Sequence, residues 1–200
     1  HAYHRRQRQM CIRDSAGALA KNLGIEHSEI SIKEMFESFS KGLSKSFKGL
    51  KTDKTEENLQ SRCRGVTLMA LSNKLGYLVL TTGNKSEAAV GYSTLYGDTA
   101  GGFSVLKDVS KTLVYELSKY RNTISNVIPQ RIIDRPPSAE LAPDQKDTDS
   151  LPDYDRLDPI IEMYVEEDKS IHEIINEGFD EVEVRRIVSL IDFNEYKRRQ

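Results

Sequence analysis

The stretch YLVLTTGNKSEAAVGYSTLYGDTAGG, residues 77–102, decides which fold class the chain belongs to. Its first five residues, 77–81, form a continuous apolar run, which is typical of a central strand in a parallel sheet. Small Gly, Thr and Ser residues follow this run and enclose the start of a helix. In an open α/β sheet, ligands bind where the parallel strands end. The segment from Thr81 to Glu87 is therefore a candidate ligand site.

Two interpretations of this segment remain open. Small residues let the backbone approach a nucleotide closely, and the carboxylate of Glu87 can hold Mg²⁺ beside phosphate groups. The alternative is a simple turn from strand to helix, in which Glu87 only caps the helix.

Helix and strand patterns alternate on both sides of the run. Residues 16–23 have the pattern of a helix end with Gly24 as its cap, and residues 25–32 alternate like a short strand. Apolar residues at helical spacing predict three more helices, marked by Phe36, Phe39, Leu43 and Phe47, by Leu59, Cys63, Val66 and Ala70, and by Leu113, Val114, Leu117 and Tyr120. Thr55 is expected to cap the second of these helices and Gly76 to end it, while Asp108 or Ser110 opens the third. The alternation predicts an α/β fold with a parallel sheet and crossover helices.

The C-terminal part of the chain has a different character. Residues 129–152 hold five of the six prolines, and so long a connection predicts an ordered loop or a lid. Two capping boxes, Ser170 with Glu173 and Asp180 with Glu183, predict that residues 153–200 form short helices.

Composition excludes several classes of protein. The 200 residues are 38% hydrophobic with a formal net charge of -2, so no overall basic field favours nucleic acid as a partner. No apolar run approaches the roughly 20 residues that a membrane span needs. Two cysteines, Cys11 and Cys63, are too few for a disulfide framework, which favours a cytoplasmic location. Residues 1–15 carry four arginines against Asp14, a net charge of +3, and we expect them to be a leader foreign to the fold.

Other polar residues fit ligand contacts, each with an ordinary alternative. Asn58 and Arg62 are four apart on one helix face, where they suit a carboxylate or phosphate, or simply face solvent. Lys111 at a helix start suits phosphate, although an exposed lysine is commoner. Ser138 is an ordinary loop serine by pattern alone. Lys197, in the terminal YKRRQ, belongs either to a frayed tail or to a strap that returns to a phosphate.

Several long strings together resemble the NAD⁺ synthetases. These strings are ENLQSRCRG at 57–65, LTTGNKSEAAVGYSTLYGDTAGG at 80–102, KDVSKTLVYEL at 107–117, RPPSAELAPDQKDTDSLPDYDRLD at 135–158 and NEYKRRQ at 194–200. The resemblance runs from about residue 16 to residue 200 and is nearer the large, glutamine-dependent branch. It implies an adenine nucleotide alpha-hydrolase-like fold (a PP-loop ATP pyrophosphatase), with three α/β/α layers around a parallel sheet and a small helical C-terminal part.

The resemblance also implies a reaction. ATP, helped by Mg²⁺, adenylates the nicotinate carboxylate of deamido-NAD⁺ (nicotinic acid adenine dinucleotide) and releases pyrophosphate. Ammonia then attacks this adenylate, which gives NAD⁺ and releases AMP. The ammonia is expected to come from glutamine through an amidase domain, and the enzyme to be a homo-oligomer. Residues that match the family's motifs are Thr82, Lys111 and Ser138 for ATP, Asn58, Arg62, Glu87, Asp98 and Lys197 for deamido-NAD⁺, and Glu87 for the metal.

One motif of the family is not found in these residues. The family binds the pyrophosphate of ATP with a Ser-Gly-Gly-x-Asp-Ser loop, and no such string occurs here. We therefore expect a synthetase domain that is incomplete N-terminally and nearly inactive alone. Two alternatives stay open: another PP-loop ligase, such as a GMP-synthetase-like or tRNA-thiolating protein, and a non-catalytic fragment that binds nucleotide or dimerises.

Overall fold

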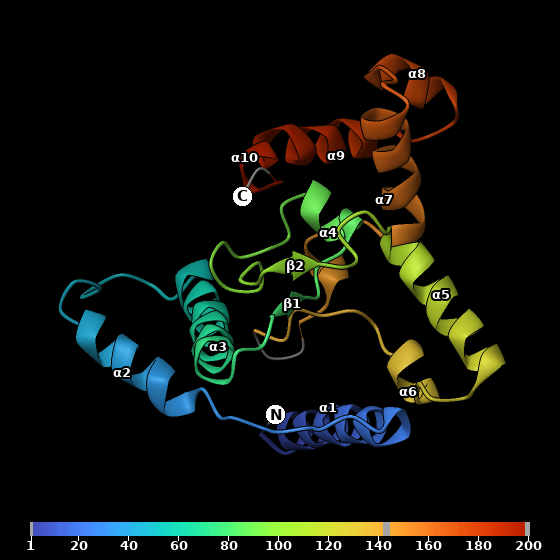
Figure 1. Cartoon of the computed structure of the whole chain (residues 1–200). Coiled ribbons are helices and arrows are strands. Elements are labelled where there is room, and N and C mark those ends of the chain that lie inside the picture. The colour runs from blue at the N-terminus through green and yellow to red at the C-terminus, as the bar shows by residue number, and fades with distance from the viewer. Residues whose placement is uncertain (1, 142–144, 199–200) are drawn as a thin grey trace. The chain divides into compact units, whose positions relative to one another are not determined.

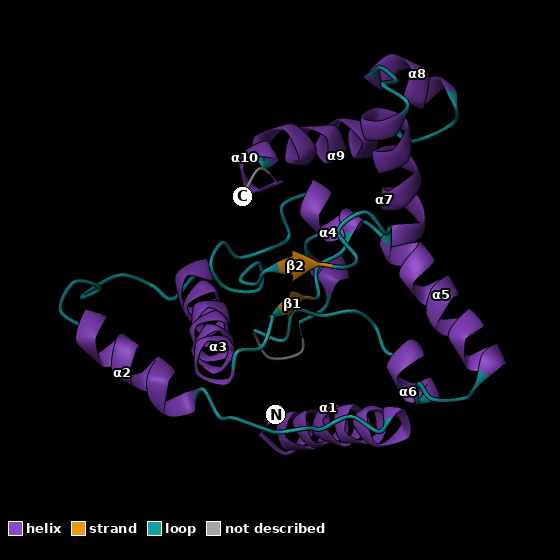
Figure 2. Ribbon diagram, viewed as in Figure 1, coloured by secondary structure: helices purple, strands orange, loops and turns teal. Residues whose placement is uncertain are grey.

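The computed structural model describes residues 2–141 and 145–198, which form two compact units. The first unit comprises His1–Ile30 and Thr112–Ser150, and the second comprises Ser31–Lys111 and Leu151–Gln200. Helices predominate in both, as Figure 2 shows, and the strands of the described residues form one two-stranded sheet. Within the described residues, no helix is long and apolar enough to cross a membrane.

The first unit is built from helices and their connections. Its elements are α1 (Ala2–Leu23), α5 (Lys111–Ile124) from its second residue onward, α6 (Gln130–Ile133) and the 3-10 helix η1 (Asp147–Asp149). Gly24 ends α1 at a φ of 66°, as its position in the sequence predicts. The Asn22 side chain then donates to the Val127 carbonyl at 2.8 Å, so the end of α1 is tied to the turn after α5.

Residues 25–32 do not form the predicted strand. Their backbone is irregular, and Ile25 and Ile30 are both more than half exposed. The alternating pattern is present, but a strand also needs a neighbour for its amides and carbonyls, and the sheet of the described residues contains only two other strands. The prediction for this segment is therefore wrong.

The proline-rich segment 129–152 contains short ordered pieces. α6 and η1 both lie within it, and residues 142–144 fall outside the described part of the chain. The Asp147 amide donates to the Pro137 carbonyl at 3.0 Å, which closes a loop inside the segment. An ordered loop is thus present in the described residues, while its role as a lid stays a prediction.

The second unit carries the sheet and most of the core. Its elements, labelled in Figure 1, are α2 (Lys33–Leu43), α3 (Lys54–Leu75), β1 (Leu80–Thr81), α4 (Lys85–Ala89), β2 (Phe103–Ser104), α7 (Tyr154–Ile161), the π-helix η2 (Glu162–Glu166), α8 (Ile171–Asn176), α9 (Glu181–Phe193) and α10 (Glu195–Arg198). The pairing of β1 with β2 is parallel, with Leu80 opposite Phe103, which confirms the predicted orientation.

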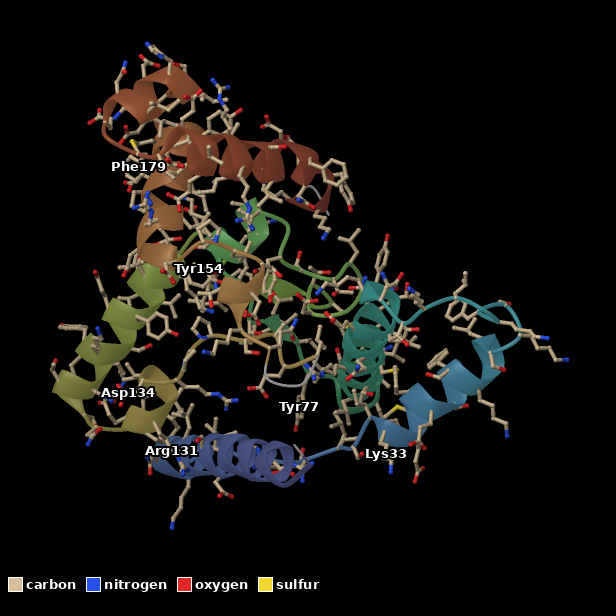
Figure 3. The ribbon with its side chains drawn as sticks, turned by 180° about the vertical axis from the view of Figure 1, so that it is seen from behind. Lys33, Tyr77, Arg131, Asp134, Tyr154 and Phe179 are labelled. Atoms are coloured by element: carbon tan, nitrogen blue, oxygen red, sulfur yellow. The ribbon has the colours of Figure 1, made fainter. Side chains whose placement is uncertain are left out.

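β1 is shorter than the apolar run that predicts it. Only Leu80 and Thr81 of residues 77–81 are paired, whereas Tyr77 (labelled in Figure 3) and Leu78 are exposed. A central strand is buried on both faces and paired on both edges. Among the described residues β1 has β2 alone as its partner, and β2 is itself only two residues long.

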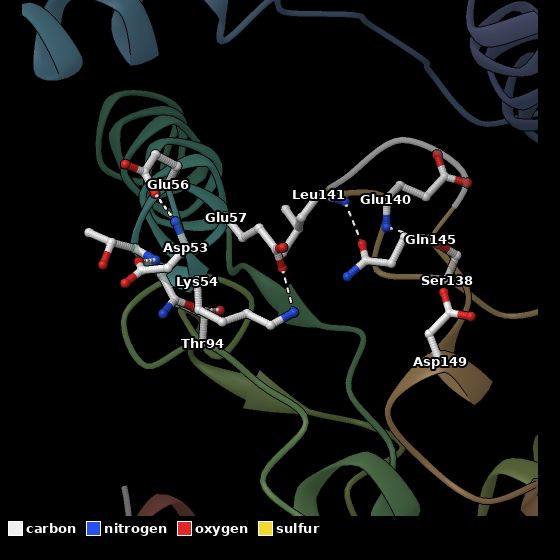
Figure 4. Close-up of polar contacts among 12 residues, drawn as sticks. Asp53, Lys54, Glu56, Glu57, Thr94, Ser138, Glu140, Leu141, Gln145 and Asp149 are labelled. Atoms are coloured by element: carbon white, nitrogen blue, oxygen red, sulfur yellow. Dashed lines mark hydrogen bonds and ion pairs between the residues drawn. The ribbon is translucent and has the colours of Figure 1, made fainter. Parts of the chain in front are cut away.

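The start of α3 differs from the prediction by two residues. Asp53, not Thr55, caps the helix, because its carboxylate accepts from the Thr55 amide at 2.8 Å. The Glu56 carboxylate accepts in return from the Asp53 amide at 2.9 Å, as Figure 4 shows. Such a reciprocal pair satisfies two otherwise free amides of the first turn.

The buried face of α3 is lined by small residues, and of the predicted apolar stripe only Cys63 is buried. Ser61, Cys63 and Gly65 are buried, whereas Val66 is 61% exposed. A Cβ at Gly65 would lie 2.8 Å from the Tyr96 carbonyl oxygen. The backbone of a loop therefore covers this face, and backbone can approach a helix so closely only where the side chains are small.

The C-terminal helices hold the main hydrophobic core of the second unit. Leu157, Ile160, Ile174, Val184 and Ile187 have no exposed surface, and Phe179, labelled in Figure 3, packs against them. The Ser170 and Glu173 capping box is formed as predicted, and the Asp180 carboxylate accepts from the Glu183 amide at 2.9 Å. The predicted short helices of this region are thus confirmed.

This core should dominate the stability of the second unit. Ile187→Ala should lower the free energy of unfolding by about 2–5 kcal/mol, because it leaves a cavity at a fully buried position. Val182 lies on the same helix and is 75% exposed, so Val182→Ala should change the free energy by less than about 0.5 kcal/mol. Urea unfolding measures both, and equal effects would contradict the position of the core.

Candidate active site

A cavity of about 260 Å³ opens beyond the end of β1. Its wall is formed by residues from the end of β1, from α4 and the turn before it, from the loop 93–102, from β2 with Lys107, and from α10. Charged side chains in this wall are Glu87, Asp98, Lys107, Lys197 and Arg198. Cations thus outnumber carboxylates, which suits a ligand that carries negative charge.

Glu87 and Lys111 meet at the start of α4. Asn84 caps this helix, since its side-chain oxygen accepts from the Glu87 amide at 3.0 Å. The Lys111 ammonium lies 2.8 Å from the Glu87 carboxylate, and both side chains are less than one-fifth exposed. The same ammonium is 5.4 Å from the ring centre of Tyr154 at the start of α7. The predicted phosphate-binding lysine and metal-binding glutamate are therefore direct neighbours.

Residues of α3 hold the loop that carries Asp98. Asn58 accepts through its side-chain oxygen from the Thr94 hydroxyl at 2.9 Å, and Arg62 donates to the Leu95 carbonyl at 3.2 Å. The Asp98 carboxylate itself accepts from the Ser61 hydroxyl at 2.9 Å. Asn58 and Arg62 thus contact the loop as well as sharing a helix face, and neither lines the cavity.

The C-terminal segment Asn194–Arg198 returns to the end of α4 as a strap. Lys197 donates to the Gly91 and Ser93 carbonyls at 2.7 and 2.9 Å, and Arg198 donates to the Ala89 carbonyl at 2.9 Å. Figure 1 shows α10 beside α4. Of the two predicted alternatives, the structure shows a strap as far as residue 198, with backbone carbonyls as its partners. Its return to a phosphate stays a prediction.

A glycine makes this approach possible. Gly91 has a φ of 68°, and a Cβ there would lie 2.2 Å from the side chain of Asn194. Both the backbone conformation and the contact exclude a larger residue.

Thr82 and Ser138 are not among the residues that line the cavity. Thr82 follows β1 and is exposed, while its neighbours Thr81 and Gly83 line the cavity. Ser138 belongs to the first unit, where its hydroxyl accepts from the Glu140 amide at 3.1 Å (Figure 4). The second unit thus brings together Glu87, Lys111, Asp98 and Lys197.

Sequence reasoning did not single out Lys107 and Arg198, which also line the cavity. Both occur in strings that carry the family resemblance, KDVSKTLVYEL and NEYKRRQ. Their positions within these strings could have marked them as candidate site residues.

The carboxylates of the cavity fit a magnesium ion that is shared with phosphate. Mg²⁺ keeps several waters and is usually held by one or two carboxylates together with phosphate oxygens. Glu87 and Asp98 provide two such carboxylates in one wall. The described residues contain no group of three or more His, Cys, Asp and Glu that could hold an ion without phosphate.

The arrangement is that of an α/β protein with a charged cavity beyond the end of a parallel strand. A family model described as NAD synthase matches residues 6–200, so the chain belongs to the NAD synthase family. The family predicted from the sequence is thereby confirmed. The match begins inside the predicted leader 1–15, whose origin stays a prediction.

Several relatives resemble the chain over almost its whole length. It is 57% identical to the glutamine-dependent NAD(+) synthetase of Acinetobacter baylyi, covering 94% of this chain and 35% of that protein. For the Thermotoga maritima protein of the same name the identity is 52%, with 94% and 33% covered. The chain therefore spans about a third of the length of these relatives.

Solved structures confirm the predicted fold class. The glutamine-dependent NAD+ synthetase from Acinetobacter baumannii in complex with ADP has a TM-score of 0.61 at 49% identity, covering 93% of this chain and 33% of that one. The NMN synthetase from Francisella tularensis has a TM-score of 0.74 at 27% identity, covering 93% and 69%.

Burial lowers the pKa of Lys197, and the charge of Asp98 opposes part of this effect. Because the pKa in the folded state lies below that in the unfolded state, the free energy of unfolding should rise with pH across the interval between the two values. Asp98→Asn keeps an acceptor oxygen but removes the charge, so it should lower the pKa of Lys197 further. NMR titration of ¹³C-labelled lysines measures this.

Lys169 serves as the internal control for this titration. Its pKa is raised by hydrogen bonds to Glu167 and Glu177, and it should not respond to Asp98→Asn. A pKa of Lys197 that equals or exceeds the ordinary lysine value would contradict its burial beside the cavity.

Proposed function

We propose that this chain is the synthetase part of an ATP-dependent ligase that amidates deamido-NAD⁺ to NAD⁺. The observation that carries the proposal is the pair of Glu87 and Lys111 beside a cavity rich in cations, in a chain of the NAD synthase family. The names of the relatives support glutamine as the nitrogen source of the whole protein. An ADP complex of one similar structure supports ATP as the co-substrate.

The charges of the site suit the formation of an adenylate. A carboxylate becomes reactive only when its oxygen is part of a good leaving group, and the phosphate charge has to be balanced while that group forms. Lys111 would bind phosphate oxygens in place of Glu87, and Glu87 would then be free to hold Mg²⁺. When bound there, Mg²⁺ would supply charge neutralisation for the leaving pyrophosphate.

The remaining residues are assigned by the same proposal. Thr82 and Ser138 would contact ATP, while Asn58, Arg62, Asp98 and Lys197 would contact deamido-NAD⁺ or shape its loop. For Asn58, Arg62 and Lys197, the hydrogen bonds to residues 91–95 support a part in shaping the loop. Each of these roles is a proposal for mutagenesis.

A homo-oligomer in the cytoplasm completes the proposal. Leu80 and Phe103 are both more than half exposed on the sheet, which supports burial against another surface. Cys63 is a buried free thiol whose pKa is raised by burial, which suits a structural cysteine in a reducing compartment.

Binding of nucleotide is the first test. The chain should bind Mg²⁺–ADP, and Lys111→Met should weaken binding by at least about tenfold, because a hydrogen bond to a charged group contributes roughly 1.5–3 kcal/mol. Glu87→Gln should remove most of the dependence of ADP affinity on Mg²⁺. Isothermal titration calorimetry measures both effects.

Glu183→Gln provides the matched control for these titrations. It breaks another ion pair of the second unit, with Arg156, outside the cavity. It should leave ADP affinity unchanged. If the unmodified chain binds no Mg²⁺–ADP, the proposed function is wrong.

Turnover is the second test. The chain should form NAD⁺ from deamido-NAD⁺, ATP, Mg²⁺ and ammonia more than tenfold more slowly than an intact ammonia-dependent synthetase. The reason is that the phosphate loop does not occur in its 200 residues, and losing one preorganised donor typically costs on the order of 10²-fold. Chromatographic detection of NAD⁺ decides this, and a rate within tenfold of the intact enzyme would contradict the expected role of the loop.

A further inference from the structure

Ser86 occupies an unusual position in the second unit, because its buried hydroxyl connects α4 with α7 and with the backbone of Lys111. Its side chain is 1% exposed at the second residue of α4. The hydroxyl donates to the Asp158 carboxylate in α7 and accepts at 2.8 Å from the amide of Lys111, the first residue of α5. These partners lie 72 and 25 residues away in the sequence.

The two hydrogen bonds use the single donor of the hydroxyl and one of its two acceptor lone pairs. A serine hydroxyl has one donor and can accept in addition, so it can connect a carboxylate to an amide. Asp158 is 8% exposed, and a buried carboxylate is costly unless polar groups compensate it. The first amide of a helix has no partner within the helix, and Ser86 supplies one for α5.

Ser86 and its partner Lys111 are both directly linked to the ion pair of Glu87 and Lys111. Ser86 precedes Glu87 in α4, and the Lys111 amide belongs to the residue whose ammonium lies 2.8 Å from the Glu87 carboxylate. Residues 86–87 and Lys111 are therefore joined twice, once through the backbone of Lys111 and once through its side chain. The Lys85 amide adds a third contact, donating to the Val109 carbonyl at 2.9 Å.

α7 supports the pair from one face. Tyr154 and Asp158 are four residues apart and hence on the same side of the helix. The Tyr154 ring lies 5.4 Å from the Lys111 ammonium, while Asp158 accepts from Ser86. One helix thus contacts both the side chain of Lys111 and the hydroxyl that binds its backbone.

We propose that Ser86 and Asp158 are positioning residues, which set the distance between Lys111 and Glu87 and thereby the affinity of the site for Mg²⁺–phosphate. The proposal rests on the proposed function for its ligand, and on the hydrogen bonds of Ser86 for its mechanism. Neither residue lines the cavity, so both act through Lys111.

The test compares matched variants by calorimetry with Mg²⁺–ADP. Ser86→Ala should weaken binding about fivefold or more, the factor that corresponds to one net hydrogen bond of about 1 kcal/mol. Asp158→Ala should act similarly, whereas Asp158→Asn keeps an acceptor oxygen and should remain within about twofold of the unmodified chain. Ile187→Val, a core change elsewhere in the second unit, controls for loss of stability alone.

A double-mutant cycle separates positioning from general damage. In the Lys111→Met background, Ser86→Ala should cause no further loss of affinity, because its effect is transmitted through Lys111. The same fivefold loss in both backgrounds, or no loss in either, would overturn the proposal.

A measurement without nucleotide tests the hydrogen bond between Ser86 and the Lys111 amide independently of the ligand. Hydrogen exchange of the Lys111 amide should accelerate at least about tenfold in Ser86→Ala and stay unchanged in Asp158→Asn and Ile187→Val. If the unmodified chain binds no Mg²⁺–ADP, the proposed function fails while exchange still decides the connection. Unchanged exchange in Ser86→Ala would overturn the inference.

Discussion

The site depends on a helix of five residues, α4, that is too short to be stable alone. Isolated helices below roughly 12 residues are marginally stable in water, because forming the first turn loses more conformational entropy than its hydrogen bonds compensate. α4 spans only Lys85–Ala89, so contacts from outside have to fix both of its ends. Asn84 and Ser86 do so at its start, and the strap residues Lys197 and Arg198 do so at its end. The orientation of Glu87 follows from these contacts and not from helix propensity.

Electrostatic balance is the second requirement of the site. Glu87 and Lys111 compensate each other where both are largely shielded from solvent, which offsets part of the desolvation cost of holding two charges there. Lys197 is stabilised by carbonyl oxygens but desolvated, and its lowered pKa reflects that desolvation. Under the proposed function, Glu87 and Lys111 would exchange their ion pair for contacts with metal and phosphate, since the charges are already in place.

The sequence rules predicted helix ends and caps correctly where the feature depends only on residues close by in the sequence. Gly24 and Gly76 end their helices with a positive φ, and Ser170 with Glu173 forms its capping box, because each feature involves backbone within a few positions. The same rules failed where the local structure depends on contacts with residues far away in the sequence. Residues 25–32 alternate like a strand but lack a partner, and the buried face of α3 follows the close approach of loop backbone at Gly65. Such errors arise because a sequence pattern shows which residues are hydrophobic but not which distant residues will pack against them.

The sequence by itself determined the family, the parallel character of the sheet and the positions of most helices. It also identified some of the charged residues that line the cavity. These properties reside in local spacing and in long, specific strings such as residues 80–102. Only the tertiary structure decided that Lys111 faces Glu87, that Asn58 and Arg62 hold a loop, and that Lys197 binds the carbonyls of residues 91 and 93. Each of these contacts joins residues 24 to 106 positions apart, and hydrogen bonds and ion pairs depend on distance in space, which spacing along the chain does not encode.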